Sequence, residues 1–449
     1  MLAFFLYAAC AVSAIVVQDH SSFLPLGLFN DGRREYDLLS LAVLAVLSGM
    51  LGIFGFEVLR GRTLIAGRLA RAALACFFLL EAALTVFDVG WVSRDPHGRA
   101  GGPYYERRTA SGERIFLLKG PPALEFAFRS PRSEPRHSAV PRVLFLGDSY
   151  TQGSGSDFAC NYPTVVEAEL TRRLGTPVEV MNAGIGGYGP VDAAALLRFL
   201  DEEGFRFDAI VFNLFLENDF TDNLPGTERR VVAGINFRFP SSWYLRLFHP
   251  LNSRVFRYAL FARTAGALAG GAAEPAAPNP GLCKTAPAPP EPVGEELRAH
   301  VERKLAANYA VPMEALGLSE VDRAVESMQS LAAARDVPLV LVVFPDRILA
   351  DAELQDALSL GDRARSTDLG RLRRWVRESF PTLPQIDVTD VLAAGVRPYQ
   401  SFDTHLSDAG NVLAGQFVGA RLAEILGPAL RQRSDEGRAA LLVQPSGNR

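Results

Sequence analysis

From Pro141 onward, short apolar runs alternate with longer segments of helical periodicity, and this alternation constrains the fold more than any other feature of the chain. The strand-like runs are 143–146, 178–181, 209–215, 339–344 and 385–388. Strands that alternate with helices form a parallel sheet covered by helices, with the functional site at the carboxyl ends of the strands. We therefore predict a three-layer α/β/α domain over residues 141–430.

The front of the chain is more apolar than the rest. Hydrophobic residues make up 48% of the 449 residues. The excess lies at 2–17, 38–59 and 69–89, and the last two runs reach the roughly 20 residues that a helix needs to cross a membrane. The first run lacks the positively charged start of a signal peptide, although its small residues leave cleavage open. We expect residues 1–91 to form a transmembrane anchor with three spans.

Arginine placement predicts the orientation of these spans. The connection after the second run carries Arg60, Arg62, Arg68 and Arg71 and no acidic residue. Since cytoplasmic loops of membrane proteins are enriched in Lys and Arg, this loop is expected in the cytoplasm. The chain is then a multi-pass protein of the inner (cytoplasmic) membrane, with its catalytic domain on the periplasmic or extracytoplasmic side.

The acidic residues Glu81 and Glu57 fall inside the predicted spans. Glu81 lies in the third run, and an ionisable residue within a membrane is by default a functional candidate. Two alternatives are open, because Glu81 can face another span or lie close to the lipid headgroups. Glu57 lies near a membrane surface, where Arg60 is expected to pair with it.

A connector is predicted between the anchor and the α/β domain. Residues 92–140 contain two strand-like runs, 104–109 and 114–118, around the turn sequence Ala110-Ser-Gly112. We expect this segment to be extracytoplasmic and mostly exposed, with a β-hairpin.

The α/β domain is interrupted once and followed by a tail. Residues 265–292 are rich in Ala, Pro and Gly and are predicted to be a flexible insertion. The aromatic segment 243–261 can cover the site as a lid, contact the membrane or pack as helices. Residues 431–449 form the C-terminal tail.

In an oxidising compartment Cys160 and Cys283 can form a disulfide, although spacing alone does not establish the pairing.

Charge and ligand spacing exclude two function classes. The net charge of −4 gives no basic surface for nucleic acid. The chain has no His-x-x-x-His and no Cys-x-x-Cys pair of metal ligands. We therefore expect no cofactor, no metal and no nucleic-acid partner.

Ser149 occupies a position suited to a nucleophile. It follows the apolar run 143–146 in the sequence Gly147-Asp148-Ser149, where a tight turn is expected to open a helix. A hydroxyl at this point can project beyond the sheet, near backbone N–H groups that favour a developing oxyanion. Alternatively, the serine merely caps the helix.

A serine hydroxyl needs a base within hydrogen-bond reach, and the base needs a third group to orient it. His405 and Asp403, in Asp-Thr-His just before the last helical run 408–426, can supply both. The other five histidines have no comparable setting, although Asp403 can also serve as a helix cap.

Two further segments can supply oxyanion donors. Residues 184–189 are glycine-rich and follow the strand-like run 178–181, so their N–H groups can approach a ligand closely. Asn218, after the run 209–215, can offer its side-chain amide. A plain turn and a helix cap remain the alternative readings.

These four segments together resemble the SGNH or GDSL-type serine hydrolases over roughly residues 140 to 426, apart from the insertion. The resemblance implies a flavodoxin-like fold and a cofactor-free esterase or acyltransferase. It implies Ser149 as nucleophile, with His405 and Asp403 completing the triad. The implied oxyanion hole comprises Ser149, Gly187 and Asn218. Asp148, Asp219 and Glu217 would be supporting residues.

Two positions depart from the family pattern. Leu216 and Glu217 precede Asn218, where the family usually has a glycine and a variable residue, so a carboxylate can face the pocket. Asp403 and His405 are separated by one residue instead of two. Asp-x-His also occurs in relatives that resemble polysaccharide O-acetyltransferases, so the spacing does not separate hydrolase from transferase.

We therefore expect a membrane-anchored esterase that removes acyl groups, acetyl above all, from a cell-envelope glycan or lipid. The first alternative is an O-acyltransferase that works with a membrane-bound acyl donor. The second is a catalytically silent scaffold that binds envelope glycans.

Overall fold

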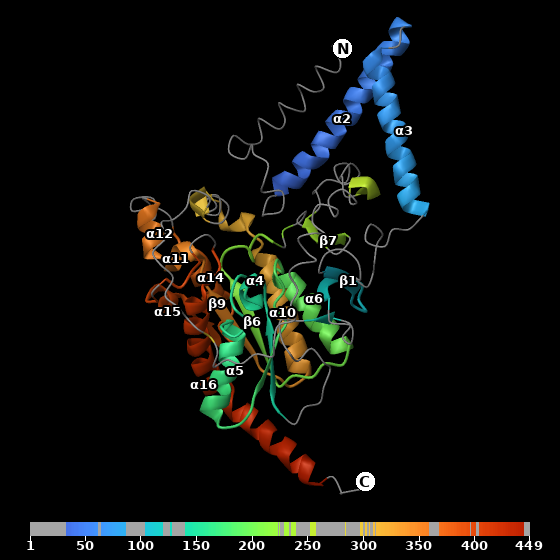
Figure 1. Cartoon of the computed structure of the whole chain (residues 1–449). Helices are drawn as coiled ribbons and strands as arrows, with labels where there is room; N and C mark the ends of the chain where they lie inside the picture. Colours follow the sequence, from blue (N-terminus) through green and yellow to red (C-terminus); the bar gives the residue numbers. More distant parts are fainter. Residues whose placement is uncertain are drawn as a thin grey trace. The chain divides into compact units, whose positions relative to one another are not determined.

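The computed structural model divides into two units, one comprising residues 1–107 and 225–273 and the other residues 108–224 and 274–449 (Figure 1). The residues it describes are 33–61, 64–86, 104–119, 126–127, 140–222, 224, 229–232, 235–238, 252–256, 283, 297–299, 301–302, 305, 309, 311–358, 368–395, 397–400 and 404–443. The apolar run 2–17, the triad candidate Asp403 and most of the segments 243–261 and 265–292 lie outside the described residues.

A five-stranded parallel sheet forms the centre of the second unit. Its strand order is β10-β9-β6-β4-β5, which is the flavodoxin-like order with β4 as the first strand. The strands are β4 (Arg142–Leu146), β5 (Glu179–Asn182), β6 (Ala209–Phe215), β9 (Leu339–Phe344) and β10 (Gln385–Asp387). Every residue of β4, β6 and β9 is buried, as expected for strands covered on both faces. The sequence-based prediction of a parallel α/β sheet is confirmed.

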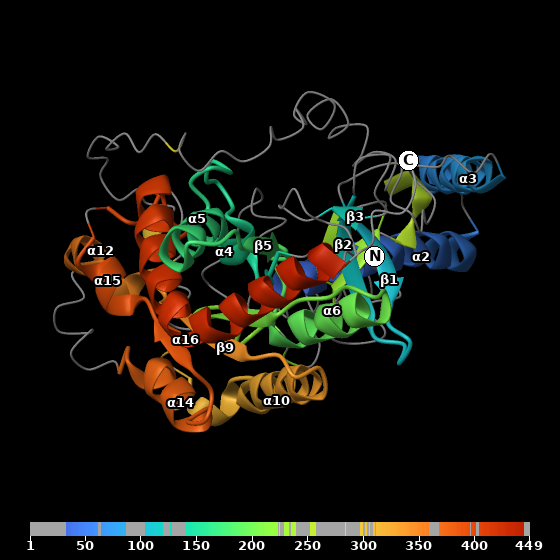
Figure 2. The same ribbon diagram turned by 90° about the horizontal axis from the view of Figure 1, so that it is seen from below.

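Helices cover both faces of this sheet (Figure 2). On one face α5 (Tyr162–Leu174) packs against α16 (Asp408–Val443), and on the other α6 (Pro190–Glu202) packs against α10 (Leu318–Ala334). In α10 the buried residues Val321, Ala324, Val325, Met328 and Ala332 recur at helical spacing, which gives this helix its apolar face. The shorter helices are α4 (Ser149–Gln152), α11 (Arg347–Ala350), α12 (Ala352–Ala357), α14 (Arg371–Ser379) and α15 (Thr389–Ala393).

The last helix is longer than the sequence pattern indicates. The pattern predicts a helix over 408–426, but α16 continues to Val443 with Pro428 inside it. Tertiary contacts beyond the proline hold the extension. Leu430 is buried, and the Ser434 and Thr176 hydroxyls lie 2.7 Å apart.

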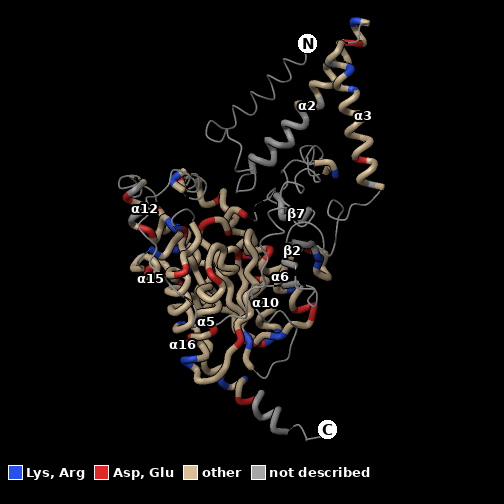
Figure 3. The backbone as a smooth tube through the Cα atoms, in the orientation of Figure 1, with Lys and Arg blue, Asp and Glu red and all other residues tan. Residues whose placement is uncertain are grey.

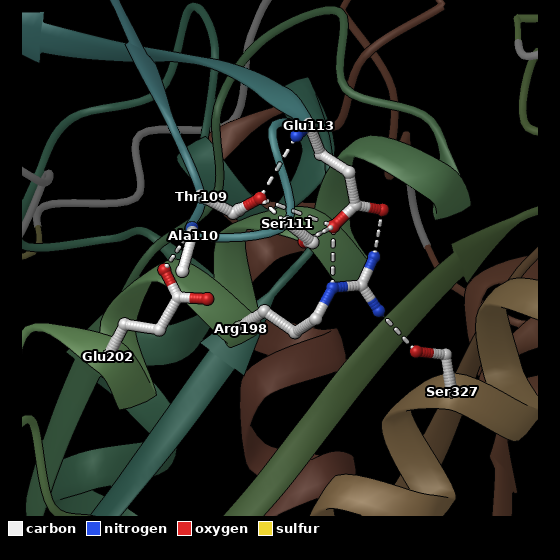
Figure 4. A network of polar contacts seen from close by, with 7 residues as sticks. All are labelled: Thr109, Ala110, Ser111, Glu113, Arg198, Glu202 and Ser327. Carbon is white, nitrogen blue, oxygen red and sulfur yellow. Dashed lines mark hydrogen bonds and ion pairs between the residues drawn. The ribbon is translucent and has the colours of Figure 1, made fainter.

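The predicted connector strands are present. β1 (Tyr104–Arg108) and β2 (Arg114–Lys119) flank a turn in which the Gly112 N–H donates to Thr109 O, and β2 pairs with β3 (Phe126–Ala127). Side chains from α6 hold this turn (Figure 4). Arg198 contacts Glu113 and the Ser327 hydroxyl of α10, and the Ala110 N–H donates to Glu202 Oε2 at 2.8 Å.

In the first unit, α2 (Arg33–Arg60) and α3 (Ile65–Val86) are joined by a turn at which charged residues gather (Figure 3). Glu57 accepts hydrogen bonds from Leu64 N–H at 2.6 Å and from Arg71 Nη1 at 2.5 Å. The ion pair of Glu57 is therefore with Arg71 across the turn and not with Arg60, the partner that we expected. A Cβ on Gly67 would lie 2.0 Å from Glu57 Oε1, so glycine makes room for this carboxylate.

The runs 38–59 and 69–89, predicted as membrane spans, fall on α2 and α3. Across the described ranges, no helix combines the length and the hydropathy that a transmembrane crossing requires.

Glu81 of α3 binds a segment that lies far from it in the sequence. Its carboxylate accepts from the backbone N–H groups of Arg254 at 2.6 Å and Val255 at 3.0 Å, and from the Ser253 hydroxyl at 3.0 Å. Glu81 thus caps the short helical turn 254–256.

The first unit also contains the antiparallel pair β7 (Arg229–Val232) and β8 (Ile235–Arg238).

Cys160 and Cys283 are joined by a disulfide, with their Cα atoms 5.0 Å apart. The pairing that the sequence left open is therefore present. It ties residue 283, in the predicted insertion, to the segment that leads into α5.

Candidate active site

Ser149 lies at the first position of α4, directly beyond the carboxyl end of β4. The turn depends on Gly147, whose φ of 156° is in a region that favours glycine and whose Cβ, if present, would lie 2.3 Å from Thr151 Oγ1. Asp148 is the N-cap, and its Oδ1 accepts the Tyr150 N–H at 2.9 Å. Capping is therefore performed by Asp148, which leaves the Ser149 hydroxyl available for another role.

His405 reaches this hydroxyl from the other end of the sequence. His405 Nε2 and Ser149 Oγ are 2.8 Å apart, which is hydrogen-bond distance. The loop that carries His405 is fixed by a bridge between Tyr399 and Leu406 and by donation from Gln400 N–H to His405 O at 2.9 Å. The structure thus brings together the predicted nucleophile and base. Asp403, the predicted third member, lies outside the described residues.

The glycine-rich loop 184–189 is tied to the same short helix. Asn182 Nδ2 donates to Thr151 O at 2.7 Å, and the Gly186 N–H donates to Gln152 Oε1 at 2.7 Å. A Cβ on Gly186 would lie 3.7 Å from the Cβ of Ser149, so this loop runs close beside the serine. Gly187 follows with φ 82°, a left-handed conformation that suits glycine.

Asn218 lies in the turn after β6, the strand adjacent to β4. Its Nδ2 donates to Asp222 Oδ2 at 2.6 Å, and its backbone oxygen accepts from the Asp222 N–H. Asp219, one residue further, accepts the Phe215 N–H at 2.8 Å and so closes the turn onto the end of β6. The asparagine is therefore held by its own turn at the sheet edge where Ser149 lies.

Four acidic side chains are buried near the serine: Asp148, Glu217, Asp219 and Asp222. Burial raises the pKa of Asp148 to about 6, with the negative charges of Asp222 and Glu217 adding to the rise and the Tyr150 N–H and His405 opposing it. Burial, with the charge of Asp148 next in size, also raises the pKa of Asp219 well above its usual range. Because positive charge on His405 lowers the pKa of Asp148, ionised Asp148 in turn stabilises positive charge on His405.

Tyr150 is a site residue that the motif comparison did not single out. Its side chain is 3% exposed, and its hydroxyl donates to Thr404 O at 2.5 Å. Its ring centroid lies 5.4 Å from that of His405. The only sequence signal was its place directly after the nucleophile, because the contact joins residues 254 positions apart.

These residues meet where the strand order changes direction. Ser149 follows β4 and Asn218 follows β6, the neighbouring strands between which a flavodoxin-like sheet opens a crevice at its carboxyl edge. Within the described parts of the chain, no group of three or more His, Cys, Asp or Glu side chains is arranged to hold a metal ion.

No protein-family model and no curated protein sequence matches the chain. Solved structures that resemble it include a carbohydrate acetylesterase family member from Sinorhizobium meliloti, with 14% identity and a TM-score of 0.31, covering 64% of this chain and 100% of that chain. A psychrotrophic esterase from Pseudoalteromonas sp. has 9% identity and a TM-score of 0.30, covering 64% and 98%. A lipase from a goat rumen metagenome has 12% identity and a TM-score of 0.32, covering 63% and 97%. Similarities this low carry no assignment, so the function has to be argued from the site itself.

Proposed function

We propose that the protein is a serine esterase that forms an acyl-serine intermediate on Ser149. The observation that carries the proposal is the 2.8 Å contact between His405 Nε2 and Ser149 Oγ at the carboxyl edge of the sheet. A nucleophile and a base within hydrogen-bond reach are what covalent acyl transfer requires. The glycine-rich loop runs close beside Ser149, which supports the proposal that the Gly187 N–H serves as an oxyanion donor.

In the proposed mechanism, His405 accepts the Ser149 proton as Oγ forms a bond to the ester carbonyl carbon. The oxyanion is met by the N–H groups of Ser149 and Gly187 and by the Asn218 amide, and each such donor is worth a factor of about 100 to 1,000 in rate. A primary amide has two N–H groups, so Asn218 can keep its bond to Asp222 and offer the other.

Collapse of the tetrahedral intermediate breaks the bond to the alcohol, and the imidazolium of His405 returns the proton to the leaving oxygen. Water, deprotonated by the same histidine, then releases the acid and free Ser149. Asp403 is proposed to orient His405 through its other ring nitrogen, as the third member of such triads does. Ionised Asp148 would favour the imidazolium by its negative charge, and Glu217 and Asp219 are proposed to support the site through their interactions with Asp148.

The proposed substrate is an acylated, above all acetylated, glycan or lipid of the cell envelope, and the proposed location is the outer side of the cytoplasmic membrane. Two observations support the proposed location. The Cys160–Cys283 disulfide suits an oxidising compartment. Large apolar side chains on α2 and α3, such as Val58 at 81% and Leu79 at 71%, are exposed. Recovery of the full-length protein in the soluble fraction of its native cells would contradict this location.

An O-acyltransferase is the second candidate, favoured by the single residue between Asp403 and His405. In that reaction a sugar hydroxyl replaces water and attacks the acyl-serine. Supplying an acetyl ester donor together with an oligosaccharide distinguishes the two, because a transferase forms acetylated sugar faster than free acetate. A silent glycan-binding scaffold would form neither product.

The test of the proposal is the hydrolysis of p-nitrophenyl acetate by the full-length protein, beside Ser149→Ala and His405→Ala. We expect both variants to lose at least a factor of 1,000 in kcat/KM, since residues of such a triad act as a unit. Circular dichroism and the thermal midpoint would confirm that each variant is folded. A wild-type rate no higher than that of folded Ser149→Ala would overturn the proposal.

A further inference from the structure

Tyr150 connects the nucleophile segment to the base segment. It is the residue next to Ser149 on α4, and its hydroxyl crosses to Thr404 O, the carbonyl of the residue next to His405, at 2.5 Å. This bond therefore links the immediate neighbours of the two reacting groups. Burial raises the pKa of Tyr150 well above its usual value, so the hydroxyl stays protonated and keeps donating across the working pH range.

The ring of Tyr150 also limits where the imidazole can lie. Its plane is tilted by 32° from that of His405, and the ring centroids are 5.4 Å apart. The Tyr150 ring also packs against Phe215 of β6 and Phe344 of β9, with distances of 4.0 Å and 5.7 Å between ring centroids. Both phenylalanines lie at the carboxyl end of a central strand. Tyr150 therefore packs both against the imidazole and against two buried aromatic residues of the central strands.

This arrangement matters because Ser149 and His405 come from segments 256 residues apart. Nothing in their local sequence fixes the distance between them. Proton transfer requires the donor and acceptor atoms to lie within about 2.6–3.2 Å of one another. A displacement of about 1 Å can cost on the order of 100-fold in rate.

Resting on the proposed esterase function, we infer that Tyr150 is a positioning residue for the base: its hydroxyl holds the Thr404 peptide so that His405 Nε2 stays within reach of Ser149 Oγ. Tyr150 does not exchange a proton with the substrate, because its own proton is directed to a backbone carbonyl. Its effect is on the placement of His405, and removal of the hydroxyl should lower kcat more than it changes KM.

Tyr150→Phe keeps the ring and removes the hydroxyl. Tyr162→Phe is a matched control, because Tyr162 is also fully buried beside Phe344 but its hydroxyl lies 3.1 Å from Thr151 Oγ1, away from the base loop. Each change removes one buried hydrogen bond, so both variants should lose similar stability, about 0.5–1.5 kcal/mol. A thermal midpoint for each variant checks this.

The measurement is kcat and KM for p-nitrophenyl acetate in the full-length wild type, Tyr150→Phe, Tyr162→Phe and Ser149→Ala, repeated from pH 5.5 to 9. We expect Tyr150→Phe to lose at least tenfold in kcat with KM within a factor of two and with an altered acid limb of the pH profile. Tyr162→Phe should keep kcat within a factor of two and the wild-type profile.

The outcomes separate this inference from the esterase proposal. If the wild type is active and both phenylalanine variants behave alike, the role of Tyr150 is wrong while the esterase function stands. If the wild type is no faster than Ser149→Ala, the esterase function itself fails, and the catalytic role of Tyr150 fails with it.

Discussion

At the scale of single residues, the site combines a serine and a histidine within hydrogen-bond distance with several buried acidic side chains. Asp148 is 1% exposed and Glu217 is 3% exposed, and the negative charge of Glu217 adds to the rise in the pKa of Asp148. Buried carboxylates are costly in their charged form, so they persist where their field has a use. In the proposed reaction that use is the imidazolium of His405.

The raised pKa of Asp148 gives a testable dependence of stability on pH. The carboxyl holds its proton up to about pH 6 in the folded protein, whereas its usual value is 3.8. Between these values the folded state binds more protons than the unfolded state, so stability falls as pH rises through the window. Asp148→Asn carries no charge and can still accept the Tyr150 N–H through its side-chain oxygen.

We therefore expect the free energy of unfolding of Asp148→Asn, relative to wild type, to increase from pH 4.5 to pH 7.5 by on the order of 1–3 kcal/mol. Urea unfolding at several pH values measures it. A difference between variant and wild type that is constant over this range would show that Asp148 does not carry the raised pKa.

At the scale of elements, the turn from β4 to α4 is the most constrained part of the site. Gly147 closes it, Asp148 caps it, and the next four residues form α4 and reach the base loop and the glycine-rich loop. The sequence motif predicted the turn and the serine, because glycine and capping residues have local preferences. It did not predict the roles of Tyr150 and Gln152, since those depend on partners brought near only by the fold.

Alanine substitutions at Gly147 and Gly175 compare a position where a Cβ would clash with its neighbours and a position where a Cβ has open space. Gly147→Ala places a Cβ 2.3 Å from Thr151 Oγ1 and 2.9 Å from Asn213 Cβ, so we expect a loss of about 3 kcal/mol or more in the free energy of unfolding. Gly175, at the end of α5, has φ 69° but open space around a Cβ, so Gly175→Ala should cost only about 1–2 kcal/mol. Equal losses in urea unfolding would contradict the packing described around Gly147.

At the scale of the whole molecule, apolar periodicity was a good guide to the sheet. The predicted strands 209–215 and 339–344 have the limits observed for β6 and β9, because fully apolar runs of this length are buried on both faces. Less predictable features were set by long-range contacts. The continuation of α16 past Pro428 follows from the packing of Leu430 and Ser434.

The first unit shows the same limit of local patterns. For Glu81 the sequence left two placements open and named no partner, and the structure shows that it caps a turn at residues 254–256, which no local pattern connects to α3. Glu57 was assigned to Arg60 on its own helix and instead pairs with Arg71 across the turn. The partner of each acid comes from another element, so the sequence around the acid could not identify it.

The most direct test of the central claim is covalent labelling of the full-length protein with a fluorophosphonate probe, followed by mass spectrometry of its peptides. The account predicts one adduct, on Ser149, formed at least 100-fold more slowly in His405→Ala and absent in Ser149→Ala. Labelling at another residue, or labelling of Ser149 at the same rate without His405, would contradict a serine activated by this histidine.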